Sequence, residues 1–482
     1  MQRKFITNLA FLLFLNLLIK PFWLLGIDRS VQNATGAEVY GAYYALFNFS
    51  FLFNILLDMG ITNFNNRNIS QNRHLLDKHL SGILTLRLGL AALYLVVNVV
   101  ACTLIGYSFE QMYMLLVLLL NQILISFILY LRSNLAGLHL FKTDSVISVL
   151  DRAIMILFCS VLLWGNVTDV PFRIEWFIWA QTLAYVITTI ITFMVVARKA
   201  VFTKVRWNPL FALMILKKSY PFAVLILLMT FYNRIDTVML ERLLVDGSRE
   251  AGIYAQAYRL LDASNMIAYL FAGLLLPLFS HMLKHQHNIR DLLRLSYALI
   301  AVPAIMAGSA AIFFRFEIMD LLYKEHAAES ADIFAIIMTC FFAISTTYIF
   351  GTLLTANGNL KQLNIMASIG MGFNILMNFI LIPSFFAKGA AVASLMTQFS
   401  TALIQVILCK RIFNLKIDFK LISKFLAFIG ATLTITWWMS NTSLPWMISL
   451  VIAMTISLGI ALIIRLVNLK MMFLIVKNES EP

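Results

Sequence analysis

Long apolar segments separated by short polar ones run along the whole of this 482-residue chain. Each has on the order of 20 residues, the length that an α-helix needs to cross the hydrocarbon core of a bilayer. In hydrocarbon every backbone polar group must be paired within its own element, so these segments are expected to be helices. The pattern therefore predicts an all-α integral membrane protein with about 14 transmembrane helices.

Polar residues and glycines mark the ends of several segments. The first apolar segment, residues 5–27, is too long for a signal-peptide core, lacks a small-residue cleavage site and contains Lys20, so we interpret it as the first span. A short outer loop is expected over residues 28–38. The second span is predicted to end at Asp58, and the third and fourth spans to form a tight hairpin around Gly106 and Glu110.

The beginning of the chain is echoed near its middle. Residues 39–46 (VYGAYYAL) match residues 253–260 (IYAQAYRL) at both tyrosines, a small residue and the leucine, and the same register places Lys20 opposite Arg234. An even number of spans in each half gives both halves the same orientation, which indicates a parallel repeat about an axis along the membrane normal. We expect two six-helix lobes, 1–198 and 219–411, a cytoplasmic amphipathic linker, 199–218, and two further helices with a cytoplasmic tail, 412–482.

The charge distribution argues for membrane topology rather than nucleic-acid binding. Only 12% of the residues are charged and 61% are hydrophobic, although the net charge is +14. Basic clusters at 67–78, 198–218 and 410–424 alternate with acidic loops at 241–250 and 317–332. Because Lys and Arg accumulate on the cytoplasmic side, we expect a multi-pass protein with both termini in the cytoplasm and no nucleic-acid partner.

Charged side chains inside the predicted spans are the best candidates for function. A charge within a span costs several kcal/mol and normally faces a partner or a cavity. By residue count, Lys20, Arg234 and Arg259 lie in the outer part of their helices, whereas Arg87 and Arg152 lie toward the inner ends. We predict that these five cations bind an anionic substrate, since arginine matches phosphate oxygens bidentately. Candidate residues for coupling to H⁺ or Na⁺ are Asp151, Asp236 and Asp262, of which Asp262 shares a helical face with Arg259.

Structural roles remain open for some of these residues. Arg87 is close enough to its helix end to extend into the cytoplasmic interface, and Asp151 and Arg152 point to different sides of one helix, where each could pair with a neighbour. Asp58 has the position of a helix terminus, and Asp236 that of a residue near the outer surface.

No catalytic, cofactor or metal motif is present, which favours a transporter over an enzyme. His281, His285 and His287 are spaced closely enough to contact one metal ion, but a basic headgroup-facing loop is the better interpretation. The four cysteines are isolated in or beside apolar spans and indicate packing only.

Several short motifs resemble those of the polysaccharide flippases in the MATE-like multidrug/oligosaccharidyl-lipid/polysaccharide exporter superfamily. The motif that opens the twelfth span lacks the family's first glycine, and Phe385-Phe386 occupies that region. The matching pieces are Gly36-x-x-x-Tyr40-Gly41-x-Tyr43, Asp58-x-Gly60, Arg234-x-Asp236, Ala251-Gly252-x-Tyr254, Ala356-x-Gly358-x-x-Lys361, and Pro383 followed by Gly389-Ala390-Ala391-x-Ala393.

The resemblance implies two six-helix bundles around a central cavity that opens alternately to each side. It implies a flippase of the bacterial cytoplasmic (inner) membrane that turns over undecaprenyl-diphosphate-linked oligosaccharide units for O-antigen, capsule or exopolysaccharide synthesis. The implied partners are this polyprenyl-diphosphate-linked oligosaccharide, membrane lipids and the polysaccharide polymerase machinery. A cation-coupled multidrug antiporter or a lipid II flippase of the same superfamily remains an alternative, as does a membrane-embedded polymerase or ligase, which would need a larger outer loop.

Overall fold

The computed structural model describes residues 15–466, with gaps at 17, 63–64, 66–68, 70–74, 139, 166, 168, 200–208 and 416–417. Helices and short connections make up the described residues, and none of these residues lies in a strand, which confirms the predicted all-α class. Residues 67–68, 70–74 and 200–208 of the predicted basic clusters and both ends of the chain lie outside the described residues. Residues 209–218, assigned above to a linker, form the first part of a helix.

The chain forms two compact units. Unit 1 comprises residues 1–242 and 246–252, and unit 2 comprises residues 243–245 and 253–482. The seventh predicted span therefore falls almost entirely in unit 1, although the repeat assigned it to the second lobe. Compactness and internal repetition are different criteria, so the division by repeat stays a prediction.

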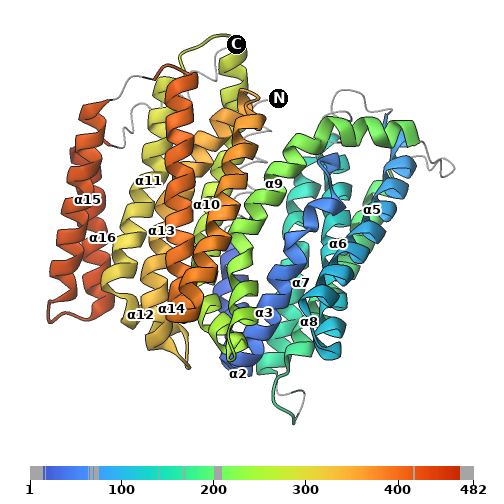
Figure 1. Ribbon diagram of the computed structural model, residues 1–482, viewed down its shortest axis with the longest axis horizontal. Coiled ribbons are helices and arrows are strands. Elements are labelled where there is room, and N and C mark those ends of the chain that lie inside the picture. The colour runs from blue at the N-terminus through green and yellow to red at the C-terminus, as the bar shows by residue number, and fades with distance from the viewer. Residues whose placement is uncertain are drawn as a thin grey trace. The chain divides into compact units, whose positions relative to one another are not determined.

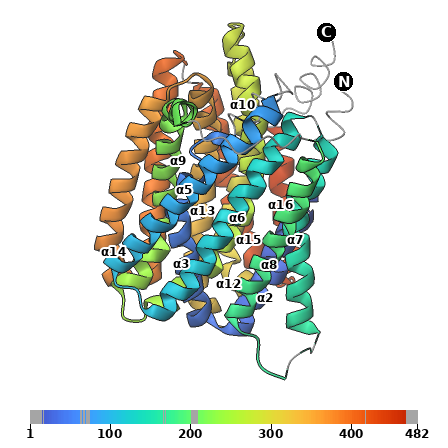
Figure 2. The same cartoon turned by 90° about the vertical axis from the view of Figure 1, so that its right-hand side faces the viewer.

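Unit 1 is built around α6, which packs against α3, α5, α7 and α8 (Figures 1 and 2). A buried cluster that includes Ile83, Leu86, Leu131 and Leu135 holds α5 and α6 together near the end where the second span breaks. The elements of unit 1 are the π-helix η1 (Trp23–Asp28), α2 (Arg29–Thr35), α3 (Ala37–Leu52), the 3₁₀-helix η2 (Asn54–Leu57), α5 (Leu75–Ile105), α6 (Phe109–Gly137), α7 (Phe141–Trp164), α8 (Ile174–Ala197) and α9 (Pro209–Leu243).

The hairpin between α5 and α6 is confirmed, and its sequence explains it. Gly106 has φ +81°, a left-handed conformation that glycine adopts without steric cost. The Ser108 side chain then caps α6 by accepting from the Gln111 backbone N–H, and the Gln111 side chain accepts from the Ser108 backbone N–H. The expected loop over 28–38 is wrong, because helix continues through Asp28 to Thr35 and the chain turns only at Gly36.

Unit 2 centres on α13, which packs against α11, α12 and α14. The pair α15 and α16 packs on α11 through a buried cluster that includes Ala298, Val302, Phe428 and Ala461. The elements of unit 2 are most of α10 (Gly247–Lys284), α11 (Arg290–Phe313), α12 (Arg315–Leu322), α13 (Ala327–Ala356), α14 (Leu360–Ile412), α15 (Phe419–Ser440) and α16 (Trp446–Ile463).

The element α14 is two helices that meet at a sharp reversal. Phe386 has φ 51° and ψ −138°, which is not helical. A Cβ on Gly389 would lie 2.4 Å from the carbonyl oxygen of Leu381, and Gln405 Nε2 lies 4.0 Å from Met366 Sδ, so the two halves run antiparallel. The break predicted between Pro383 and Gly389 is therefore confirmed, with Phe386 in the turn that the family motif gives to glycine.

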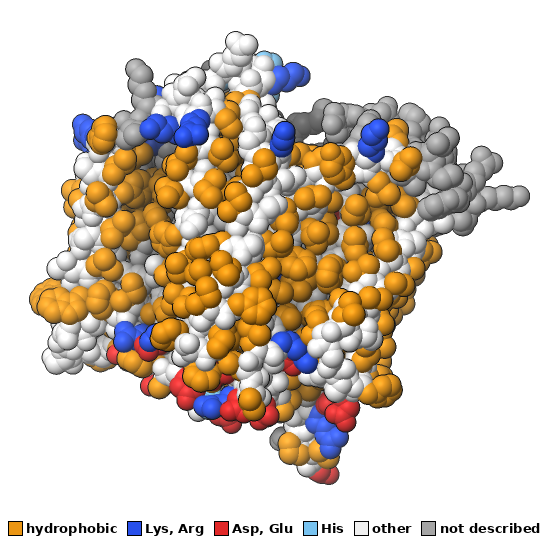
Figure 3. All heavy atoms as spheres, in the orientation of Figure 1, with side chains coloured by type: hydrophobic (Ala, Val, Ile, Leu, Met, Phe, Trp, Pro, Cys, Tyr) orange, Lys and Arg blue, Asp and Glu red, His pale blue; other side chains and the backbone are white. Residues whose placement is uncertain are grey.

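Eleven helices within the described residues are long and apolar enough to cross a membrane. Because α14 folds back, it supplies two crossings, and the third to the fourteenth predicted segments each have a counterpart. The first segment begins outside the described residues, and the second is the 16-residue α3 continued by η2. In Figure 3 apolar side chains cover the sides of the helices of unit 2, and charged side chains gather at their ends, as expected for a multi-span membrane protein. Asp and Glu lie at one end together with some Lys and Arg, and further Lys and Arg lie at the other end.

Candidate functional site

Arg152 is held by neutral groups in the middle of a membrane-spanning helix. It lies midway along α7, not toward the inner end as the residue count suggested. Its Nη1 donates to the Tyr185 hydroxyl on α8 (2.9 Å) and contacts Met155 Sδ (3.2 Å). The guanidinium carbon also lies 5.5 Å from the Trp23 ring centre, within cation–π range. Arg152 makes no ion pair among the described residues.

Lys20 lies within electrostatic range of Arg152 in unit 1. It is half-buried in the helical stretch before η1, and Arg152, Asp151 and Arg132 are close enough to influence it electrostatically. The Asp151 carboxylate accepts a hydrogen bond from the backbone N–H of Arg152 (2.8 Å) and makes no ion pair with its guanidinium. We call Lys20, Trp23, Asp151, Arg152 and Tyr185 the Arg152 cluster.

The π-helix η1 explains how Trp23 reaches this cluster. A π-helical turn inserts an extra residue and rotates the side chains that precede it relative to those that follow, and such turns are frequent at functional sites. Trp23 stacks on Phe177 of α8, with ring centres 5.6 Å apart and planes 7° apart. The Trp23 face that Arg152 meets is thereby fixed.

The same turn buries a carboxylate that the sequence interpretation placed in a loop. Asp28, the last residue of η1, is 2% exposed, and its Oδ2 accepts a hydrogen bond from the Tyr40 hydroxyl (2.8 Å). On α3 the Tyr44 ring stacks on the Tyr40 ring, and the Tyr43 ring meets Tyr40 edge to face. Residues 29–35 are mostly polar, and the available signal was the four-residue spacing of Ile27 and Val31, both fully buried, which is a helical spacing.

Arg234 on α9 is joined to α3 through an amide. Its Nη1 donates to Asn48 Oδ1 (3.3 Å), and its guanidinium carbon lies 5.7 Å from the Phe51 ring centre. The adjacent Asp236 is 1% exposed and lies seven residues before the end of α9, and its position near the outer surface stays a prediction. Its neighbour Thr237 accepts a bond from Asn48 Nδ2 (3.4 Å).

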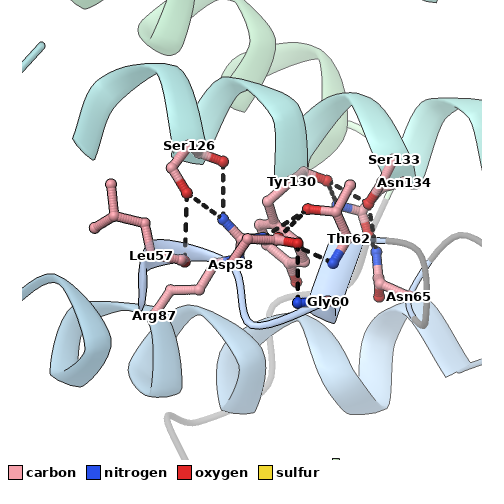
Figure 4. Close-up of polar contacts among 10 residues, drawn as sticks. All are labelled: Leu57, Asp58, Gly60, Thr62, Asn65, Arg87, Ser126, Tyr130, Ser133 and Asn134. Carbon is pink, nitrogen blue, oxygen red and sulfur yellow. Dashed lines mark hydrogen bonds and ion pairs between the residues drawn. The ribbon is translucent and has the colours of Figure 1, made fainter. Parts of the chain in front are cut away.

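Arg87 has a different environment, shown in Figure 4. It is 1% exposed, which rules out the alternative that it extends into the membrane interface. Its guanidinium forms an ion pair with Asp58, donates to the Ser126 carbonyl and hydroxyl (both 2.8 Å) and to Thr62 (2.7 Å), and lies 4.8 Å from the Tyr130 ring centre. We call these five residues the Arg87 clamp.

The clamp fixes the break that ends the second span. Asp58 follows η2, as the predicted helix terminus, and accepts bonds from the backbone N–H groups of Gly60 (3.2 Å) and Thr62 (3.1 Å). Asn65 continues the attachment by donating to Ser133 and Asn134 of α6 (both 2.9 Å; Figure 4). With its charge paired and both terminal nitrogens hydrogen-bonded, although its Nε has no partner among the described residues, Arg87 has the geometry of a structural residue.

In unit 2, Arg259 and Asp262 lie on one face of α10, as their spacing predicted. Arg259 Nη1 and Asp262 Oδ2 are 4.0 Å apart, and Arg259 is 8% exposed. One turn earlier on α10, Gln256 donates to the Glu325 carbonyl (3.0 Å) and its own carbonyl accepts from Tyr323 (3.2 Å). This pair is a charged site within the membrane-spanning part of unit 2.

Two glycines of the family motifs meet at a close helix crossing. A Cβ on Gly41 of α3 would lie 1.8 Å from the Ser248 carbonyl oxygen, and one on Gly252 would lie 1.9 Å from the Ala37 carbonyl oxygen. Gln32 bridges the same elements by donating to the Gly252 carbonyl (2.9 Å). Only glycine permits this backbone contact between α3 and the first turns of α10, which belong to unit 1.

Neutral polar residues form a second buried set that sequence reasoning did not identify. In unit 2, Asn378 donates to Asn374 (3.1 Å) within the first half of α14, and Thr397, Thr401 and Gln405 are buried in its second half. Their four-residue spacing was a visible signal, because it places them on one helical face.

The structure thus brings Lys20, Asp151 and Arg152 together, engages Arg87 elsewhere and places Arg259 with Asp262 in unit 2. Within the described part of the chain, no three His, Cys, Asp or Glu side chains are arranged to hold a metal ion. His281, His285 and His287 are exposed at the end of α10, and the ring centres of His281 and His285 are 4.5 Å apart.

Solved structures with similar folds are membrane transporters. The lipid II flippase MurJ in an inward closed conformation matches with a TM-score of 0.68 and 16% identity over 93% of this chain and 97% of that one. An inward-facing multidrug resistance MATE transporter of the MOP superfamily matches with a TM-score of 0.63 and 14% identity, covering 80% and 93%. A MOP-superfamily transporter from Pyrococcus furiosus, described as having a binding pocket of reverse polarity, matches with a TM-score of 0.55 and 13% identity over 84% of this chain and 93% of that one. These likenesses show the fold.

A search of curated proteins finds no match to this chain. A family model described as "Polysaccharide biosynthesis protein" matches residues 25–283, which is more than half of the chain. The matched region contains Arg234, Arg259 and the Arg152 cluster, apart from Lys20 and Trp23 of that cluster. The chain therefore belongs to the polysaccharide biosynthesis protein family and has the fold of the MOP-superfamily transporters.

Proposed function

We propose that this protein is a flippase that moves polyprenyl-diphosphate-linked oligosaccharide units across the bacterial cytoplasmic membrane by alternating access. The products would serve O-antigen, capsule or exopolysaccharide synthesis. The family and the transporter fold support the general activity. The anionic headgroup is inferred from the cations inside the membrane-spanning helices.

The observation that carries the proposal is the Arg152 cluster. A buried cation is costly in a membrane-spanning segment unless a partner compensates it. Arg152 is surrounded by a hydroxyl, a thioether and aromatic rings, and Lys20 lies close by. A diphosphate would supply the compensating charge and could accept from both cations at once.

A multidrug antiporter for cationic drugs is less well supported by the same geometry. Lys20 and Arg152 would repel a cation, and the one carboxylate of the cluster, Asp151, accepts a bond from the backbone. The lipid II flippase alternative shares the diphosphate and differs in the sugar, so it makes the same demand on these residues.

The membrane potential would assist outward movement of such a substrate. Moving one negative charge out of a cell with an inside-negative potential gains about 2.3 kcal/mol per 100 mV. Further coupling to H⁺ or Na⁺ at Asp151, Asp236 or Asp262 belongs to this proposal. So does delivery of the translocated unit to polysaccharide polymerase machinery.

The test is binding of undecaprenyl-diphosphate oligosaccharide to the purified protein in nanodiscs, beside a lipophilic cationic drug. We expect preference for the diphosphate lipid and a loss of about tenfold or more in Arg152→Gln and Arg234→Ala, the scale of a lost charged hydrogen bond. Arg198→Ala is the control, because Arg198 is exposed at the end of α8. Preference for the cation, or full affinity in both variants, would refute the proposal.

A cellular test uses the same variants. Cells that depend on this protein should lose surface polysaccharide with Arg234→Ala while the protein remains in the membrane. Normal polysaccharide in that strain would remove Arg234 from the mechanism.

A further inference from the structure

Asn48 connects Arg234 to α3 and is almost completely buried, at 1% exposure. Its Oδ1 accepts from Arg234 Nη1 (3.3 Å), and its Nδ2 donates to the Tyr44 carbonyl (3.0 Å) and to Thr237 Oγ1 (3.4 Å). The two sides of the amide therefore have different partners, donors on one side and acceptors on the other. Only an amide satisfies both with no net charge.

The neutrality of this contact distinguishes it from the Arg87 clamp. Arg87 meets a carboxylate that neutralises it, whereas α3 offers Arg234 an amide oxygen and the Phe51 ring. An amide fixes the direction of the guanidinium without contributing a negative charge. A carboxylate at position 48 would compete with any anionic ligand of Arg234, whatever else the guanidinium contacts.

We propose that Asn48 is a positioning residue that orients Arg234 for the diphosphate while adding no charge of its own. The inference rests on the proposed function for the identity of the ligand. It concerns a residue of α3 that acts through Arg234 and that need not touch the substrate.

The chain offers a matched control in Asn98 of α5. Asn98 is also fully buried in unit 1, and its Nδ2 makes the same bond to the carbonyl four residues earlier, at Tyr94 (2.8 Å). Its Oδ1 has no hydrogen-bond partner among the described residues. Asn98 thus reproduces the burial and the backbone bond of Asn48 without a cation.

The experiment measures binding of undecaprenyl diphosphate and of uncharged undecaprenol to nanodisc-embedded variants, together with their thermal unfolding. We expect Asn48→Asp to weaken diphosphate binding about tenfold and Asn48→Ala about threefold, with undecaprenol binding unchanged in both. Asn98→Ala should bind both lipids as the unmodified protein does. In an Arg234→Ala background, Asn48→Asp should cause no further loss, because the two residues act as one unit.

Unfolding provides the second readout. Asn48→Asp should unfold at a higher temperature than Asn98→Asp, since only the first new carboxylate has a cation beside it, and Arg234→Ala should abolish that difference. Unchanged diphosphate binding in Asn48→Asp, or an equal loss in the Arg234→Ala background, would overturn the positioning role. If Arg234→Ala itself binds diphosphate normally, the proposed ligand of Arg234 is wrong. Equal unfolding temperatures of the two aspartate variants would overturn the contact with Arg234.

Discussion

The Arg87 clamp and the Arg152 cluster both hold an arginine inside unit 1, but they surround it with different groups. Arg87 pairs with a carboxylate and donates to three further oxygens in a segment that must be held in a broken conformation. Arg152 contacts a hydroxyl, a thioether and an aromatic face, and a second cation lies within electrostatic range. The partner set, together with the lower burial of Arg152, separates a cation that stabilises the fold from one available to a ligand.

Removing one partner of the clamp should have the largest effect on stability. Arg87→Ala leaves Asp58 without its counter-ion and frees the break after η2, so we expect a loss of about 3–5 kcal/mol. The measurement is thermal unfolding in detergent, with the yield of monodisperse protein as a second readout. An unfolding temperature equal to that of the unmodified protein would show that Arg87 does not stabilise the fold.

Removing both charges of the clamp should cost less than removing one. In Arg87→Met combined with Asp58→Leu no isolated charge remains, and well-packed apolar replacements of buried ion pairs are often neutral or stabilising. We therefore expect recovery of about half or more of the loss seen in Arg87→Ala, measured in the same unfolding assay. A double variant less stable than Arg87→Ala would show that the backbone bonds of Asp58 matter more than the ion pair.

Arg152→Gln should show the reverse balance. Arg152 is half-buried and makes no ion pair among the described residues, so its loss removes a desolvation cost and we expect a change in stability of under about 1 kcal/mol. Binding of the diphosphate lipid should fall about tenfold or more. Unfolding and nanodisc binding are measured on one preparation, and a large loss of stability with normal binding would contradict the comparison.

Tyr185→Phe should have a smaller effect on the same cluster. It removes the hydroxyl that orients Arg152 but keeps the ring and the charge, so binding should weaken about threefold. The assay is again lipid binding in nanodiscs, and Tyr220→Phe is the control because Tyr220 is exposed on α9. Equal losses in Tyr185→Phe and Arg152→Gln would mean that orientation, not charge, dominates.

A substitution outside both the Arg87 clamp and the Arg152 cluster should change stability least. Phe386 is half-exposed and has a positive φ that favours glycine, so Phe386→Gly is expected to raise stability by about 1 kcal/mol. Neither diphosphate binding nor the effect of Arg87→Ala should alter. A drop in stability would show that the aromatic side chain contributes more at the reversal than the strain costs.

Much of the architecture was predictable because hydrocarbon allows few alternatives. Apolar length alone indicated the helices, Gly106 the hairpin, Asp58 the end of the second span and Pro383 with Gly389 the reversal in α14. Local chemistry decides these features, and it is contained in consecutive residues. The Arg259–Asp262 pair was predictable for the same reason, since residues three apart share a helical face.

The partners of the other buried charges were decided only by tertiary structure. Arg87 and Asp58 are 29 positions apart, Arg152 and Tyr185 are 33 apart, and Arg234 and Asn48 are 186 apart. Helical periodicity states which residues share a face but not which face meets another helix. The sequence by itself determined a helical membrane protein with charges inside it. Packing determined that Arg87 is neutralised while Arg152 is not, because a charge in low dielectric is defined by the groups that surround it.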